Sequence, residues 1–336
     1  MSRDCSVVVM AAGKGTRMKS AVPKVLHSLC GRTLLGHALA TAEGLDPRQI
    51  IVVVRHERDL VAAEVGSQAV VADQDEIPGT GRAVQCGLEQ AQGDLGRTVV
   101  VTSGDVPLLE PSTLVELVEA HEAAGAAVTL MTTIAEDPHG YGRVLRGEDG
   151  LVTAIVEEKD ATDEQRQVRE INAGIYAFET EFLLAALGNL GQDNAQGEMY
   201  LTDTVARAVA EGKKALPFVL TDRWQAEGCN DLAQLAQLRQ VLTARLCERH
   251  LLAGVSIVDP TNIQLDVQVQ LEPDCTIEPG TALRGRTVVR TGAVVGPCTT
   301  LADVEVGAGA TVPHSVLTAT EVPAGQAVAP FTRQVG

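Results

Sequence analysis

The chain carries near its start the segment SVVVMAAGKGTRM, residues 6–18, with Pro23 and Lys24 close behind. Residues 6–10 are apolar and β-branched over a short run, which predicts a buried strand. The glycines at 13 and 15 let the backbone turn tightly and bring its N–H groups close to an anion. Arg17 and Lys24 add positive charge at the same place. A strand that opens into such a loop predicts a phosphate-binding site.

Two common phosphate-binding loops do not fit this segment. A Walker A loop requires glycine at position 8 and serine or threonine at position 15, where this chain has Val8 and Gly15. The dinucleotide-binding fingerprint requires a third glycine at position 18, where Met18 stands. For the Gly-Lys-Gly triplet alone, an ordinary strand-to-helix turn is an equally good interpretation.

Composition narrows the class of protein. A chain of 336 residues with 45% apolar content has room for two domains and a large core. A formal net charge of −17 and 2% aromatic residues argue against nucleic acid or an anionic membrane as a partner. An acidic protein that binds a nucleotide must gather its cations locally and recruit a divalent metal. Seven cysteines without a C-x-x-C pair, and no signal-peptide or membrane-spanning pattern, predict a cytoplasmic protein with reduced thiols.

Strand and helix patterns alternate over the first 133 residues, which predicts an α/β fold with a mostly parallel, doubly wound sheet. Ligands of such sheets bind beyond the carboxyl ends of the strands. We therefore expect the loops after Met10, Val71 and Thr102 to meet at one cleft. Asp105 lies in the last of these loops, where it can hold a metal ion, although an Asx-turn or a helix cap is the commoner use of such a residue.

The C-terminal third has a different period. After a helical pattern at 232–253, apolar residues recur every six positions, and turn residues punctuate the series. A period of six with short β-branched runs is typical of a hexapeptide β-helix of about four coils. The predicted inward positions are Leu265, Leu271, Ile277, Leu283, Val289, Val295 and Leu301, and, after a three-residue phase shift, Val304, Ala310, Val316, Val322 and Val328.

The loop at residues 11–18, together with Pro-Lys-Val-Leu-His at 23–27, resembles the signature of sugar-1-phosphate nucleotidylyltransferases. The chain is most similar to the family of bacterial bifunctional N-acetylglucosamine-1-phosphate uridyltransferases/glucosamine-1-phosphate acetyltransferases. The resemblance implies a Rossmann-like nucleotidyltransferase domain at 1–230, a helical linker at 231–252 and a short left-handed parallel β-helix at 253–336 that packs as a homotrimer. It implies that UTP and N-acetylglucosamine-1-phosphate form pyrophosphate and UDP-N-acetylglucosamine, a peptidoglycan precursor.

The resemblance also assigns roles to residues. Catalytic charge comes from Arg17 and Lys24, and Mg²⁺ is held by Asp105 and Asn230, although Asn230 alone would be interpreted as a helix N-cap. The expected nucleotide-binding residues are Ala11, Ala12, Gly13, Gly15, Gln74, Gly79 and Thr80. The expected sugar-binding residues are Gly142, Glu157, Asn172 and Thr202. Structural roles remain an alternative for Thr202. Two positions depart from the family pattern, because Ser103 replaces an aromatic residue and Ile77 a polar one.

Two other functions are compatible with these residues. The first is a related nucleotidylyltransferase that uses another sugar or base, which a panel of substrates would reveal. The second is a catalytically silent subunit that assembles through the β-helix, which a turnover measurement would reveal. The family's later β-helix coils form its acetyl-transfer site, and this sequence stops before them, so we expect no acetyltransferase activity from residues 1–336.

Overall fold

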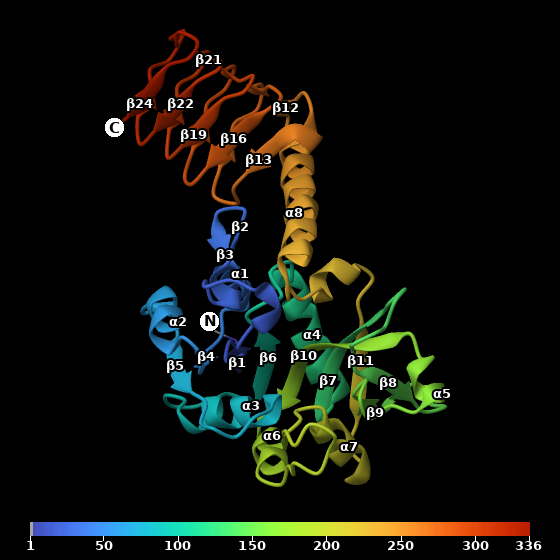
Figure 1. Ribbon diagram of the computed structural model, residues 1–336. Coiled ribbons are helices and arrows are strands. Elements are labelled where there is room, and N and C mark those ends of the chain that lie inside the picture. Colours follow the sequence, from blue (N-terminus) through green and yellow to red (C-terminus); the bar gives the residue numbers. More distant parts are fainter. Residues whose placement is uncertain (1–2) are drawn as a thin grey trace. The chain divides into compact units, whose positions relative to one another are not determined.

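The computed structural model describes residues 3–336, which divide into two compact units (Figure 1). The first unit comprises the chain up to His27 together with Leu34–Asp231. The second comprises Ser28–Thr33 together with Leu232–Gly336. Within residues 3–336, none of the helices has the length and hydropathy that a membrane span requires.

The first unit is a nine-stranded sheet with helices on both faces. Its strands are β1 (Cys5–Met10), β4 (Ile50–Val54), β5 (Val70–Asp73), β6 (Thr98–Ser103), β7 (Val128–Ile134), β8 (Arg143–Arg146), β9 (Val152–Val156), β10 (Glu170–Glu179) and β11 (Ala215–Val219). Its helices are α1 (Leu34–Glu43), α2 (Arg58–Val65), α3 (Thr80–Glu89), α4 (Pro111–Ala124), α5 (Asp163–Arg166), α6 (Thr180–Leu187) and α7 (Asp203–Ala210). Short 3₁₀ turns are η1 (Thr16–Met18), η2 (Lys24–Leu26) and η3 (Arg223–Ala226).

The strands follow the order β11-β7-β10-β6-β1-β4-β5, with β8 paired to β10 and to β9. β1 pairs in parallel with β4 and β6, β4 pairs in parallel with β5, and β11 pairs in parallel with β7. β10 is antiparallel to both of its neighbours in this order. The predicted α/β architecture is confirmed, and the antiparallel pairs are those of β10 with its neighbours and of β8 with β9.

Alternation along β1 divides the core into two layers. Val7 and Val9 are fully buried on one face among residues of α1, α2 and α4. Val8 is fully buried on the other face among residues of α3, α6 and α7. Because successive side chains of a strand point to opposite faces, a β-branched run such as residues 6–10 serves both layers. The run is therefore continuous rather than alternating in hydropathy.

The second unit begins with the hairpin β2 (Ser28–Leu29) and β3 (Arg32–Thr33), continues with the long helix α8 (Leu232–Leu252), and ends in three parallel sheets. The first sheet holds β12 (Ser256–Ile257), β15 (Thr276–Ile277), β18 (Val294–Val295) and β21 (Thr311–Val312). The second holds β13 (Ile263–Leu265), β16 (Thr281–Arg284), β19 (Thr300–Ala302), β22 (Val316–Thr318) and β24 (Arg333–Val335). The third holds β14 (Gln270–Leu271), β17 (Val288–Val289), β20 (Glu305–Val306) and β23 (Glu321–Val322).

From β12 to β23, successive strands visit the three sheets in turn, which is the arrangement of a parallel β-helix (Figure 1). The predicted inward series up to Leu301 is buried except for Leu271, which is half-buried. The predicted phase after Leu301 is correct at Val322, which is 3% exposed, but wrong at Val316. Val316 is 47% exposed, whereas its neighbour Leu317 is 2% exposed and points inward.

The physical reason is a shortening of the coils. Ala282 pairs with Thr300, eighteen residues on, but Thr300 pairs with Val316, only sixteen residues on. The inward strand positions therefore step by five at some corners instead of six. Val304 and Ala310 are buried, but they precede the inward strand residues Val306 and Val312 by two positions and fill the corners.

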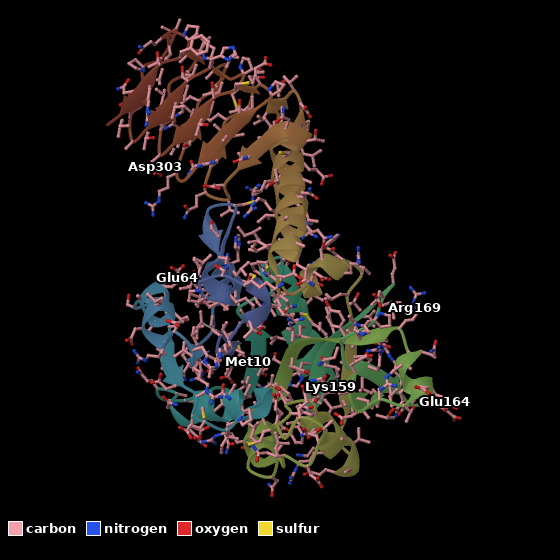
Figure 2. The ribbon with its side chains drawn as sticks, in the orientation of Figure 1. Met10, Glu64, Lys159, Glu164, Arg169 and Asp303 are labelled. Carbon is pink, nitrogen blue, oxygen red and sulfur yellow. The ribbon has the colours of Figure 1, made fainter. Side chains whose placement is uncertain are left out.

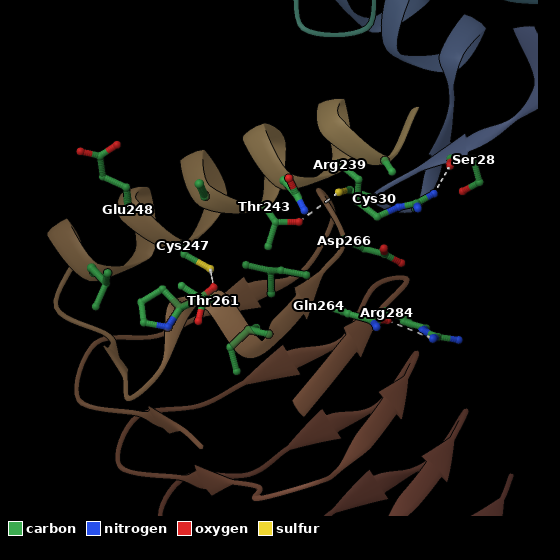
Figure 3. A pocket seen from close by; sticks show the side chains of 18 residues that line it. Ser28, Cys30, Arg239, Thr243, Cys247, Glu248, Thr261, Gln264, Asp266 and Arg284 are labelled. Atoms are coloured by element: carbon green, nitrogen blue, oxygen red, sulfur yellow. Dashed lines mark hydrogen bonds between the residues drawn. The ribbon is translucent and has the colours of Figure 1, made fainter. Parts of the chain in front are cut away.

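A groove of about 1180 Å³ lies within the second unit, between α8, the hairpin and the first coil (Figure 3). The guanidinium of Arg239 donates to the carbonyl of Ser28 at 3.0 Å, and Cys30 Sγ lies 3.6 Å from Thr243 Oγ1. The N–H of Val267 donates to the carbonyl of Cys30 at 3.0 Å. Sequence reasoning did not detect this hairpin, and none of the predicted site residues lines the groove.

Candidate active site

A cleft of about 320 Å³ opens in the first unit at the carboxyl ends of β1, β5 and β6. The loops after Met10, Val71 and Thr102 meet there, as the topology predicts. Met10, from which the first loop departs, is labelled in Figure 2. The predicted site residues that line the cleft are Ala11, Ala12, Gly13, Lys24, Gln74, Gly79, Thr80 and Asp105.

The loop that contains Gly13 and Gly15 has one end fixed in the core and is open to solvent at Gly13. Met18 is 2% exposed and anchors η1 in the core. Gly15 has φ +63°, and a Cβ there would press against the side chain of Lys24, so the position favours glycine on both counts. A Cβ at Gly13 would meet no atom within 4 Å. Neither backbone strain nor a close contact requires glycine at position 13. The space beside it leaves the loop accessible to a ligand.

Four predicted residues from distant parts of the chain form one polar cluster. The ammonium of Lys24 forms an ion pair with Asp105, and its Nζ lies 3.2 Å from Asn230 Oδ1. The guanidinium of Arg17 donates to the same Asn230 oxygen at 2.7 Å. The side chains of Lys24 and Asp105 are only 15% and 14% exposed, so water screens this pair less than a surface pair. In the sequence, Lys24 and Asn230 are 206 residues apart.

Two further hydrogen bonds fix the position of Asp105. The hydroxyl of Ser103 donates to Asp105 Oδ1 at 2.6 Å, and the N–H of Cys229 donates to the Asp105 carbonyl at 2.9 Å. The second contact ties the loop after β6 to the segment that carries Asn230. Ser103, which departs from the family pattern, thus orients the carboxylate.

The carboxylate of Asp105 and the carboxamide of Asn230 suit a hard divalent cation. Both oxygens approach the same ammonium nitrogen, which shows that a single cation can contact the two of them. Oxygen ligands from one carboxylate and one amide are typical of magnesium sites, where water and substrate phosphates supply the remaining ligands. Over residues 3–336, no group of three or more His, Cys, Asp or Glu side chains forms a separate metal site.

The loop after β5 is shaped by the backbone of Met199. The N–H of Gly81 donates to the Met199 carbonyl at 2.8 Å, and the N–H of Met199 donates to the Pro78 carbonyl at 3.0 Å. Gly79 has φ +120°, and a Cβ there would collide with the backbone of Met199. The hydroxyl of Thr80 accepts from the N–H of Leu201 at 3.0 Å.

Gln74 supports this loop with its amide. Its Nε2 donates to the carbonyls of Ile77 at 3.0 Å and of Gly79 at 3.3 Å. The carbonyl oxygen of the same amide is an acceptor, suited to an N–H of a pyrimidine. Ile77 is 39% exposed and does not line the cleft.

The four predicted sugar-binding residues also come together. The hydroxyl of Thr202 donates to Glu157 Oε1 at 3.3 Å, and the N–H of Asn172 donates to the Gly142 carbonyl at 2.9 Å. A Cβ at Gly142 would lie 3.5 Å from both carboxylate oxygens of Glu157. Burial raises the pKa of Glu157, while the hydrogen bond from Thr202 opposes that shift. Thr202 precedes α7, but its hydroxyl contacts Glu157 and makes no capping hydrogen bond.

Sequence reasoning missed several residues of the cleft. Lys14, Arg55, His56 and Glu198 line it. Burial lowers the pKa of His56, and the charges of Arg55 and Lys14 act in the same direction. Arg55 and His56 directly follow the buried strand β4, so the rule that places ligands at strand ends could have found them. Glu198 carries no such signal.

Tyr141, which directly precedes Gly142, was not predicted as a site residue. Its hydroxyl lies 3.4 Å from Glu227 Oε1. Burial raises the pKa of Tyr141 to about 12, and the charges of Glu227 and Asp105 act in the same direction. Its phenol therefore stays protonated at neutral pH and links the segment that carries Gly142 to the segment before Asn230.

Comparison with known proteins agrees with this geometry. Residues 7–173 match the family model of the MobA-like NTP transferase domain. The bifunctional protein GlmU of Pseudarthrobacter chlorophenolicus is 52% identical over 332 residues, which cover 97% of this chain and 68% of the relative. The GlmU protein of Kineococcus radiotolerans is 52% identical over 329 residues, covering 97% and 67%. That of Micrococcus luteus is 47% identical over 347 residues, covering 98% and 70%.

The first unit therefore supplies a nucleotidyltransferase cleft, and the full sequence matches relatives of one kind along almost its entire length. The chain belongs to the GlmU family, as an enzyme that transfers the uridylyl group of UTP to N-acetylglucosamine-1-phosphate and so makes UDP-N-acetylglucosamine, a cell-wall precursor.

Proposed function

We propose that the cleft of the first unit carries out this transfer by in-line attack. An oxygen of the sugar phosphate attacks the α-phosphorus of UTP, the bond to the bridging oxygen of the β-phosphate breaks, and pyrophosphate leaves from the opposite face. The attacking phosphate is already ionised, so the reaction needs no general base. Such transfers require mainly alignment and neutralisation of charge.

The basic residues of the cluster divide this task. The backbone N–H groups around Gly13 and Gly15, with Arg17, hold the β- and γ-phosphates and the departing pyrophosphate. Lys24 neutralises the α-phosphate and the sugar phosphate. Support comes from the open approach at Gly13 and from the convergence of Lys24 and Arg17 on Asn230.

Members of this family use a divalent metal, and we propose Mg²⁺, held by Asp105 and Asn230. When bound, the ion supplies positive charge to the phosphate oxygens and fixes their orientation. The contribution of the chain is a pair of oxygen ligands whose positions are set by Ser103 and by the backbone of Cys229. The single observation that carries the proposal is that Asp105 and Asn230 both contact the ammonium of Lys24.

Selectivity is assigned to the two other groups of residues. Gln74, Gly79 and Thr80 read the uracil base through the amide of Gln74 and the backbone of the loop. Gly142, Glu157, Asn172 and Thr202 hold the N-acetylglucosamine moiety, with carboxylate and amide groups for the hydroxyls and glycine for close approach to the acetamido group.

We further propose that 1–230 is the nucleotidyltransferase domain, that 231–252 is a helical linker and that 253–336 is a left-handed β-helix through which three chains assemble. Three parallel sheets visited in turn support the β-helix, and the mass of the protein in solution tests the trimer. Six of the seven cysteines are buried, which fits reduced thiols and supports a cytoplasmic location.

Pyrophosphate release tests the mechanism and the selectivity together. Release from UTP should require both N-acetylglucosamine-1-phosphate and Mg²⁺, and a chelator should abolish it. CTP, dTTP and glucose-1-phosphate, each replacing one substrate, should give much lower rates. Equal rates across this panel would favour a nucleotidylyltransferase of another specificity, and release that continues in excess chelator would exclude the proposed metal site.

A further inference from the structure

A buried arginine connects three short sequence motifs, around Gly142, Glu157 and Asn172, to which we assign the sugar. Arg143, on β8, is 2% exposed. Its Nη2 donates to Glu158 Oε2 at 2.6 Å, and its Nη1 donates to the carbonyl of Tyr141. We propose that Arg143, together with Glu158, is a positioning residue for the sugar-phosphate side of the cleft. This inference rests on the proposed function, because it presupposes that Gly142, Glu157 and Asn172 contact the sugar.

The backbone of Arg143 lies between the two other motifs. It pairs with Val156 of β9, the residue before Glu157, and with Ile171 of β10, the residue before Asn172. The side chain of Arg143 then reaches Glu158, the residue after Glu157. Both neighbours of Glu157 in the sequence are therefore held by the same arginine, one through the backbone ladder and one through the ion pair.

This arrangement restricts where the carboxylate of Glu157 can lie. A Cβ at Gly142 would be only 3.5 Å from each of its oxygens, so the chain passes directly beside the carboxylate just before β8 begins at Arg143. The hydroxyl of Thr202, from a later part of the chain, donates to the same carboxylate at 3.3 Å. A small rotation of the 157–158 turn would move the carboxylate away from the hydroxyls that it is proposed to bind.

Stability alone is a weak explanation for this ion pair. A buried pair gains little over apolar residues of similar volume, because both charges lose their hydration. The Nε of Arg143 is buried and has no hydrogen-bond partner among residues 3–336, which adds to that cost. Buried ionic groups of this kind are better suited to fixing one geometry among several.

The pair also fastens the charged segment that links β9 with β10, along which Lys159, Glu164 and Arg169 are labelled in Figure 2. Glu158 accepts from the N–H of Gly140 at 3.4 Å, and its backbone carbonyl accepts from Arg166 at 3.4 Å. Glu158 thus joins the segment to the turn before Gly142. These contacts give the charged segment a defined path beside the site.

The experiment compares the KM for N-acetylglucosamine-1-phosphate with the KM for UTP in pyrophosphate release. We expect Arg143→Met to raise the sugar-phosphate KM by about tenfold or more, because small misplacements of binding groups are costly, and to leave the UTP KM within about twofold. The double variant Arg143→Met/Glu158→Met removes both charges of the ion pair. It should recover thermal stability and still show the raised sugar-phosphate KM.

A purely structural role predicts the opposite for the double variant, in which recovered stability would restore the KM. The inference is also overturned if Arg143→Met leaves the sugar-phosphate KM unchanged or raises both KM values equally. If Arg143→Met does not fold, Glu158→Gln is the deciding variant. It should fold, because Glu158 is 23% exposed and the glutamine amide oxygen can still accept a hydrogen bond from Arg143. We then expect a several-fold rise of the sugar-phosphate KM alone, and no rise refutes the inference.

Arg146→Met is the matched control. Arg146 lies on the same strand and pairs with Glu170 through two hydrogen bonds of 2.7 and 2.5 Å, but it touches none of the motif loops. It should lower stability without changing either KM. Glu157→Gln, measured in parallel, tests the assigned sugar contact itself. If that variant keeps a normal sugar-phosphate KM, the proposed function is wrong at this residue whatever Arg143 does.

Discussion

Removal of either charge from the Lys24–Asp105 pair should nearly abolish uridylyl transfer. In the bound state each of the two groups is proposed to act on phosphate charge, Lys24 directly and Asp105 through the metal. Loss of one well-placed charge contact in a transition state is worth about 3 kcal/mol or more. That corresponds to a rate lower by about two orders of magnitude or more, because each 1.4 kcal/mol is roughly tenfold.

The same substitutions have a separate effect on stability. The two side chains are 15% and 14% exposed, so Lys24→Ala leaves a largely buried carboxylate, and Asp105→Ala leaves a largely buried ammonium. Ser103 still contacts Asp105, and Asn230 still contacts Lys24. We therefore expect each variant to lose about 1–3 kcal/mol of unfolding free energy, the usual cost of one unpaired buried group, and to remain folded.

The assay is pyrophosphate release at saturating UTP, N-acetylglucosamine-1-phosphate and Mg²⁺, with thermal unfolding measured on the same samples. Lys19→Gln is the matched control, because Lys19 is an exposed lysine at the end of the same loop and does not line the cleft. It should keep the wild-type rate. If folded Lys24→Ala and Asp105→Ala also turn over at near wild-type rates, the assignment of the site is refuted.

Three further predictions concern particular residues. Gly79→Ala should raise the KM for UTP and lower stability, because Gly79 has φ +120° and a Cβ would meet the backbone of Met199; Gly93→Ala, at φ +77° with open space around it, should lower stability only. Burial raises the pKa of Glu157, so this carboxylate takes up a proton at a higher pH than an ordinary glutamate. The sugar-phosphate KM should then rise as the pH falls through that raised pKa, and Glu157→Gln should lose this dependence. Burial lowers the pKa of His121 from 6.5 to about 4, so between these values the unfolded chain binds a proton that the folded chain does not. As the pH falls from 6.5 to about 4, the free energy of unfolding should decrease by about 3 kcal/mol. Thermal unfolding of His121→Gln should not show this contribution.

The fold was predictable where its signals are local. The β-branched strand before the glycine loop and the six-residue period could be read directly from neighbouring residues. Helix α1 was not predicted, because LLGHALATAE is buried on most sides and has no amphipathic period. The predicted phase of the β-helix after Leu301 failed at Val316, since the coils shorten at corners where no residue type marks the change.

The candidate site was predictable only in part, and for a related reason. Residues carried by recognisable loops, such as Lys24 and Asp105, could be named from the sequence. The contacts that orient them join residues far apart in the chain: Cys229 reaches the backbone of Asp105, and Arg143 reaches Glu158. No local pattern indicates such partners. Ser103 reads as a departure from the family pattern in the sequence, and only the structure shows that it holds the carboxylate.

The most direct test is a crystal structure of the protein with UTP and Mg²⁺. We predict that the triphosphate lies along the loop at 11–17, with the metal ion bound to one oxygen of Asp105 and to the amide oxygen of Asn230. A nucleotide bound away from these residues, for example in the groove lined by α8, would contradict the account.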